Sequence, residues 1–148
     1  MTFRLLPKQP SAVIPLVMSV AAFLLIIAVL STVKDETIAS AGWQTYSSMV
    51  AIKEDADLDL GEIKSLLQRV AKSIHQQPNR VKYVMNHFVI AVACHVKPLH
   101  KLAVDTANGI GKVAVDLVGA CRIPFAPDQI KKFEARSAIG KKRKSPKC

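Results

Sequence analysis

Residues 59–76, with the sequence DLGEIKSLLQRVAKSIHQ, decide the fold because their apolar side chains recur at helical spacing. Large apolar residues fall at i, i+3, i+4, i+7 and i+11, which form one stripe along a helix: Ile63, Leu66, Leu67, Val70 and Ile74. Asp59 stands at the N-cap position, Glu62 follows at the spacing of a capping box, and Pro78 ends the run. The sequence therefore predicts an amphipathic helix here.

The next segment predicts a helix that is buried on most sides. It opens at Pro78-Asn79, and its apolar residues cover one face and fill much of the others. Residues 88–96 (FVIAVACHV) also suit a central strand by β-propensity. The length of the whole segment favours a helix, and the sequence offers no other clear strand to pair with it. The main apolar face of this helix carries Val81, Val84, Met85, Phe88 and Val92.

A third helix is predicted from Pro98, and Gly109 and Gly111 end it. Its stripe consists of Leu99, Leu102, Ala103, Thr106 and Ile110. We expect residues 59–110 to form three antiparallel helices with these side chains buried: Ile63, Leu67, Val70, Val84, Phe88, Val92, Leu102 and Ile110.

The rest of the chain predicts one more helix. Residues 113–125 contain Gly and Pro and predict a connection, and a short helix follows from Pro127 to about Arg136. Beyond Gly140 we expect no fixed structure. The predicted fold class is all-α, built from antiparallel helical hairpins that stack as repeats. The short helix presents Ile130 and Phe133.

The start of the chain differs from the rest. Residues 12–30 are almost wholly apolar, and as a helix they would span roughly 28 Å, the thickness of a membrane's hydrocarbon core. Three interpretations stay open. The segment is a transmembrane anchor whose preceding Arg4 and Lys8 keep the N-terminus in the cytoplasm, a signal peptide cleaved near residues 39–41, or an apolar core helix displaced from its repeat.

The domain organisation that follows has three parts. We predict an apolar N-terminal helix within residues 1–32, a helical domain at residues 33–136, and a basic tail at residues 137–148. We expect a monomer in the cytoplasm, with membrane association through residues 12–30 as the open alternative.

The positive charge is concentrated at the end of the chain. The net charge is +10, and residues 131–148 hold eight basic residues against one acidic residue. Such a basic segment favours a polyanionic partner, nucleic acid first and an anionic membrane surface second. A solvated tail without a partner is the alternative.

Cysteine and histidine spacing indicates no metal site. Three cysteines lie far apart without a CxxC pair, so the chain is not a disulfide framework. The four histidines do not fall at zinc-ligand spacing with Cys94. We therefore expect no metal and no cofactor.

Three ordered segments resemble the DNA alkylation repair enzyme family. They are VKDETIASAGWQTYSSMVAIKEDADLDL at residues 33–60, IHQQPNRVKYVMNHFVIAVACHVKPL at residues 74–99, and FEARSAIGKKRKSPKC at residues 133–148. The resemblance covers residues 33–148. The chain departs from the family pattern at Ala93-Cys94-His95 and at residues 115–124, VDLVGACRIP.

The resemblance implies HEAT-like helical repeats that bind duplex DNA and remove alkylated bases. In this family, aromatic residues and an aspartate in the concave groove stabilise the cationic base and sugar. We cannot assign a catalytic residue, so enzymatic activity stays open. From the residues themselves, Arg80 and Lys82 begin a helix whose N-terminus adds amide donors for a phosphate. The candidate DNA-binding residues are Trp43, Tyr46, Arg80, Lys82, Asn86, Lys141, Lys142, Arg143 and Lys144.

Two other functional classes remain in view. The apolar start of the chain also fits a single-pass membrane protein whose helical domain binds a partner, and the short length fits an inactive product of a disrupted gene.

Overall fold

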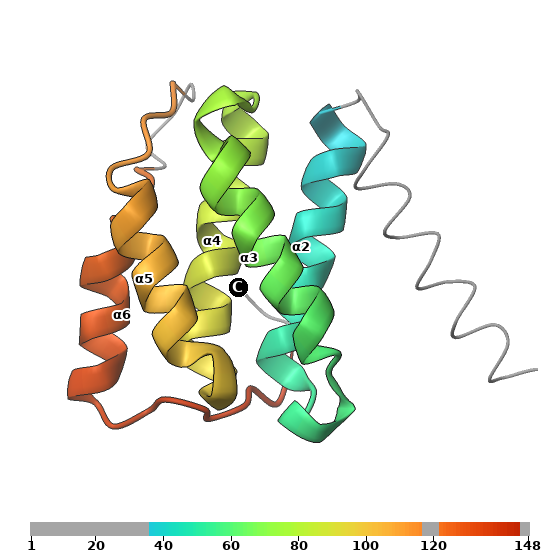
Figure 1. The fold of residues 1–148 in the computed structure, drawn as a ribbon, viewed down its shortest axis with the longest axis vertical. Coiled ribbons are helices and arrows are strands. Elements are labelled where there is room, and N and C mark those ends of the chain that lie inside the picture. The colour runs from blue at the N-terminus through green and yellow to red at the C-terminus, as the bar shows by residue number, and fades with distance from the viewer. Residues whose placement is uncertain (1–35, 117–121, 146–148) are drawn as a thin grey trace, which may run out of the picture.

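The computed structural model of the protein describes residues 36–116 and 122–145, and these residues fold as an array of helices (Figure 1). The helices are α2 (Glu36–Ile52), α3 (Leu60–Ser73), α4 (Asn79–His95), α5 (His100–Ile110) and α6 (Ala126–Ala135). Short 3-10 turns join them: η1 (Asp55–Asp57), η2 (Ile74–Gln76) and η3 (Lys97–Leu99). The described residues contain no strand, so the helical interpretation of residues 88–96 is confirmed.

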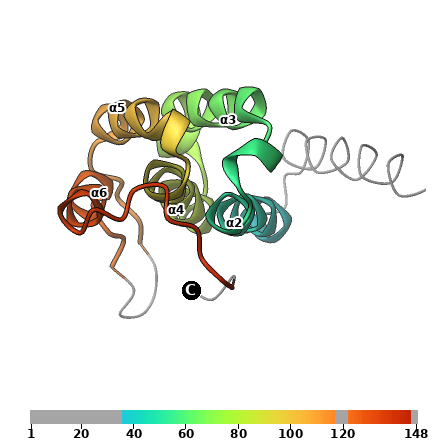
Figure 2. The same cartoon turned by 90° about the horizontal axis from the view of Figure 1, so that it is seen from below.

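The helices form two layers. Figure 2 shows α2, α4 and α6 in one layer and α3 and α5 in the other. Helices of one layer run in one direction and those of the other layer run in the opposite direction, so consecutive helices from α2 to α5 are antiparallel (Figure 1). The all-α hairpin architecture predicted from the sequence is confirmed.

Helix α4 lies at the centre of the array and packs against α2, α3, α5 and α6. Its sequence is apolar on most sides, which suits a helix with neighbours on most sides. Phe88 is fully buried, and two aromatic rings of α2 meet its ring edge-on. The ring centroid of Trp43 lies 5.1 Å away, and that of Tyr46 lies 6.4 Å away.

The predicted core residues of α3 and α4 are buried as expected, and so is Ile110. Leu102 is the exception, because it is only half-buried at the edge of the core. The buried face of α5 keeps Ala103, Thr106 and Ile110 of the predicted stripe and adds Ala107. Small residues on this face let α5 and α4 approach closely.

Helix α2 was not predicted from the sequence. Its buried positions recur at helical spacing, but several of them are small or polar, so no apolar stripe marks the helix: Ser40, Trp43, Tyr46, Ser47, Val50 and Ala51. The Ser47 hydroxyl is satisfied inside the helix, where it donates to the Trp43 carbonyl at 2.9 Å.

The predicted start of α3 and end of α5 are both present. The Asp59 side chain accepts a hydrogen bond from the Glu62 amide at 2.9 Å, as an N-cap does. Gly111, at φ 60°, follows the last residue of α5 in a conformation that glycine adopts without strain. The capping box is only half made, because the Glu62 carboxylate accepts from the Tyr46 hydroxyl instead.

The Tyr46–Glu62 pair places a carboxylate at the edge of the core. The pKa of the Glu62 carboxyl is raised, mainly because the group is partly buried. The hydrogen bond from Tyr46 lowers the pKa, and the negative charge of Asp59 raises it. The second carboxylate oxygen of Glu62 is buried and has no hydrogen-bond partner. Ionisation of Glu62 is therefore less favourable in the folded chain than in the unfolded chain.

The predicted apolar N-terminal helix, with its candidate membrane span at residues 12–30, lies outside the described residues. Among the helices of residues 36–116 and 122–145, none is both long and apolar enough to cross a membrane.

Replacing Phe88 with Ala should lower the free energy of unfolding by about 3–5 kcal/mol, because it leaves a cavity where α2 meets α4. Denaturant unfolding followed by circular dichroism measures this change. The exposed Gln68 of α3 provides the control, and Gln68→Ala should stay within about 0.5 kcal/mol of the wild type. A loss at Phe88 no larger than at Gln68 would contradict the central position of α4.

Replacing Glu62 with Gln should stabilise the protein at pH 7, since the neutral amide removes the charge of a half-buried carboxylate. A raised carboxyl pKa makes folding more favourable at low pH, and this contribution disappears as pH rises through the folded-state pKa. The advantage of Glu62→Gln over the wild type should therefore shrink on acidification. Thermal unfolding across a pH series tests this, with Glu54→Gln at an exposed position as the control. A stability difference between Glu62→Gln and the wild type that does not change with pH would contradict this expectation.

Candidate nucleic-acid interface

Residues 140–145, which we call the strap, cross the C-terminal ends of α2 and α4 (Figure 2). The last carbonyls of a helix lack hydrogen-bond donors within the helix, and two backbone amides of the strap donate to such carbonyls. The Gly140 amide donates to the Cys94 carbonyl at 2.9 Å, and the Arg143 amide donates to the Ala51 carbonyl at 2.7 Å. The expectation that no fixed structure follows Gly140 is therefore wrong for residues 141–145.

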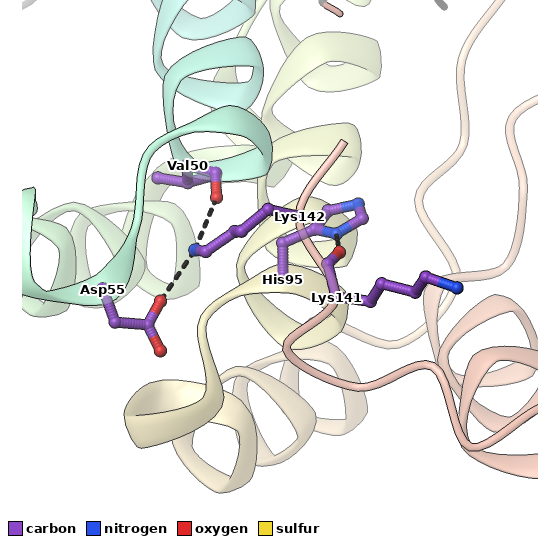
Figure 3. Close-up of polar contacts among 5 residues, drawn as sticks. All are labelled: Val50, Asp55, His95, Lys141 and Lys142. Carbon is purple, nitrogen blue, oxygen red and sulfur yellow. Dashed lines mark hydrogen bonds and ion pairs between the residues drawn. The ribbon is translucent and has the colours of Figure 1, made fainter. Parts of the chain in front are cut away.

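Lys142 anchors the strap (Figure 3). Its ammonium group lies 2.7 Å from the Asp55 carboxylate and donates to the Val50 carbonyl at 3.1 Å. Only 10% of the Lys142 side chain is exposed. A cation is favourable at this place because the carbonyl end of α2 carries partial negative charge. Lys142, which we predicted to contact DNA, is thus engaged inside the protein.

A histidine fixes the strap from the α4 side (Figure 3). Nδ1 of His95 lies 2.7 Å from the Lys141 carbonyl, which can only accept, so Nδ1 donates the proton. Burial lowers the pKa of His95 despite that hydrogen bond, and the charges of Arg143 and Lys142 lower it further. These effects favour the neutral form of the His95 ring, in which Nδ1 carries the proton.

Because Lys142 turns inward, the other basic residues of the strap form the surface. Lys141, Arg143 and Lys144 are all exposed. The adjoining helix α6 adds exposed charge at Lys131 and Lys132, and Arg136, directly after the helix, is exposed as well. Since the strap is bonded to two helix ends, these cations belong to a folded surface, which we call the strap surface.

Arg80 and Lys82 lie at the opposite end of α4 from the strap. About fifteen helical residues separate the two ends, or roughly 22 Å at 1.5 Å per residue. Arg80 is exposed and Lys82 is half-buried. The Arg80 amide donates to the Glu36 carboxylate at 2.9 Å, so the chain itself already occupies part of the predicted phosphate site at this helix N-terminus.

The remaining predicted residues belong to the core. Trp43 and Tyr46 are each 2% exposed and pack on Phe88, and Asn86 is 1% exposed. The side-chain amide of Asn86 donates through Nδ2 to the Pro124 carbonyl at 2.9 Å, and this bond connects α4 to the segment before α6. These three residues serve packing and hydrogen bonding inside the array.

A pocket that the sequence did not reveal lies between α2, α4, α6 and the strap, with a volume of about 250 Å³. Tyr83 and His87 of α4, one turn apart, line it with ring centroids 4.5 Å apart. Phe133 of α6 and Arg143 of the strap line it too. The i, i+4 spacing of the α4 rings was a signal in the sequence, but nothing there brought Phe133 or Arg143 beside them.

Burial favours the neutral form of two titratable groups that line the pocket, His87 and Cys94. Burial lowers the pKa of His87, whose Nε2 atom has no hydrogen-bond partner. Burial also raises the pKa of the Cys94 thiol to about 12, so this cysteine is not an activated nucleophile. Within residues 36–116 and 122–145, no three His, Cys, Asp or Glu side chains are grouped to hold a metal ion.

The chain is similar to bacterial proteins without an assigned function. It is 35% identical to an uncharacterized protein of Listeria monocytogenes over 99 residues, and 35% identical to one of Listeria innocua over 98 residues. Each match covers 66% of this chain and 41% of the relative, so the chain spans less than half the length of either relative. No protein-family profile matches the sequence.

A solved structure resembles the array with a TM-score of 0.74 and 32% sequence identity. The match covers 80% of this chain and 51% of the other. The fold is a HEAT-like helical repeat. The solved protein is described as one of a new family related to the HEAT-like repeat DNA glycosylases, with affinity for branched DNA structures. In the HEAT-like array of this chain, the strap surface and the pocket both involve the layer of α2, α4 and α6.

Replacing Lys142 with Ala should destabilise the HEAT-like array by about 1–2 kcal/mol, because it removes a charged hydrogen bond and a partly buried ion pair. Lys144→Ala, at an exposed position on the same strap, is the matched control and should be neutral to within about 0.5 kcal/mol. Chemical unfolding compares the two variants. Equal effects would show that Lys142 does not anchor the strap.

Proposed function

We propose that this protein binds DNA through the phosphate backbone, using the strap surface as its main contact. The observation that carries the proposal is the anchoring of the strap. Hydrogen bonds to two helix ends hold Lys141, Arg143 and Lys144 on a folded surface, so binding DNA does not require ordering a free tail. The affinity of the structural neighbour for branched DNA supports this proposal.

The second basic group fits the same partner. Arg80 and Lys82 lie roughly 22 Å from the strap along α4. This separation is shorter than one turn of B-DNA, about 34 Å, so the two groups can contact phosphates of the same duplex within one turn. Binding at both ends of α4 would orient the DNA along the layer of α2, α4 and α6.

The proposed recognition does not read base sequence. Lys and Arg side chains aimed at phosphates supply affinity and register, whereas sequence readout needs contacts to base edges. Because the structural neighbour has affinity for branched DNA structures, shape is the property that this surface is proposed to recognise.

Excision of alkylated bases is the finer activity that the family resemblance implies. It needs an aromatic face and a carboxylate directed at one sugar and base. In the described residues, Trp43 and Tyr46 are core residues, and the side chains that line the pocket include no acidic residue. We therefore propose DNA binding, without base excision, as the function of the described part of the chain.

Replacing Lys141, Arg143 and Lys144 together with Ala should weaken duplex binding and reduce its salt dependence. If each side chain contacts one phosphate, the slope of log K against log salt falls by about two to three units. Fluorescence anisotropy of a labelled duplex over a salt series measures both quantities.

The matched control removes the same charge from the other layer. Lys64 and Lys72 of α3 and Lys101 of α5 are exposed, and their combined change to Ala should alter the slope much less. Equal effects from the two triple variants would mean that net charge, and not the strap surface, determines binding.

A further inference from the structure

Phosphate contacts leave the pocket between α2, α4, α6 and the strap without a role. One wall is aromatic, formed by the paired rings of Tyr83 and His87 with Phe133 nearby. Helix α2 contributes the polar residues Gln44, Ser47 and Ser48 to the lining, together with Ala51. A pocket lined by aromatic rings and hydrogen-bonding side chains suits a flat, polar heterocycle.

The size of the pocket limits the ligand to one or two rings. Its volume is about 250 Å³, whereas pockets for drug-sized molecules begin at roughly 300 Å³. A protein cavity of roughly 150 Å³ already accommodates a benzene molecule. A single nucleobase is therefore of suitable size, and a stacked base pair is too large.

The charge of the pocket indicates an anionic ligand. Arg143 lines it, and none of the described residues that line it is acidic. A guanidinium group is well suited to bind a phosphate through paired hydrogen bonds. Arg143 also belongs to the strap surface, so a phosphate held there is continuous with the proposed path of the DNA backbone.

We infer that this pocket receives one unpaired nucleotide of a DNA strand, with its base beside Tyr83 and His87 and its phosphate at Arg143. The inference rests on the proposed DNA binding and names the part of the DNA that this site takes. A paired base cannot enter, because it must leave the stack before it can lie in the pocket. Stacking on aromatic rings is tolerant of base identity, so the pocket selects unpaired nucleotides at branches and bulges regardless of sequence.

The test compares three DNA molecules that bind the full chain under the same salt conditions. They are a perfect duplex, the same duplex with a one-nucleotide bulge, and a bulge whose extra nucleotide lacks its base. The bulged duplex should bind on the order of tenfold more tightly than the other two. Tyr83→Ala should abolish this preference while its duplex affinity stays within about twofold, and Tyr83→Phe, which retains the ring, should keep it.

A second variant tests the inference independently, in case Tyr83→Ala does not fold. Ser48→Met fills the pocket from the α2 side, leaves the aromatic wall intact, and should also abolish the preference. Circular dichroism and thermal unfolding confirm that each variant is folded. A preference for the bulge that survives both folded variants would overturn the inference.

The other outcomes separate this inference from the function on which it rests. Equal affinity for the three DNA molecules would overturn the pocket assignment and leave phosphate binding intact. No binding to any DNA would overturn both. Free deoxynucleoside monophosphates provide the last comparison. If they compete at concentrations near the dissociation constant of the bulged duplex, the pocket binds free nucleotides and the assignment to DNA is wrong.

Discussion

The burial of α4 on nearly every side is the constraint on which the rest of the array depends. Phe88 lies at the centre of this helix, and the edges of Trp43 and Tyr46 close around it from α2. On the other sides, α3 and α5 supply the second layer and α6 extends the first. Both basic groups and the aromatic wall of the pocket are positioned by the same helix, so α4 connects the core to every part of the candidate interface.

The sequence predicted those parts of the fold that depend on neighbours along the chain. The stripe of α3, the breaks at Pro78 and Gly111 and the continuous apolar surface of α4 are all local patterns, and the structure confirms them. Helix α2 was not predicted, because its buried face is rich in small residues. The docking of the strap was not predicted, because its partners are remote in sequence. Lys142 donates a hydrogen bond to the carbonyl of Val50, which lies 92 residues earlier. No spacing rule connects positions so far apart.

The candidate site was harder to predict than the fold, because residue type alone does not separate surface from core. Trp43, Tyr46 and Asn86 have the chemistry of a binding groove, yet each satisfies a need inside the array. Arg80 and the strap residues are both basic, but a full helix length separates them. The pocket combines side chains from four segments of the chain, whereas a spacing such as Tyr83–His87 relates residues of one segment alone.

The position of the strap also implies an order of folding. Its docking site consists of the carbonyl ends of two helices, so α2 and α4 must pair before the strap has anywhere to bind. The hairpins themselves involve contacts between segments near each other in sequence, which close quickly, whereas the hydrogen bond between Lys142 and Val50 closes a loop of 92 residues. We therefore expect the strap to dock last and to detach first. Its detachment would expose the helix ends without unfolding the core, and we expect early hydrogen exchange and proteolysis at the strap.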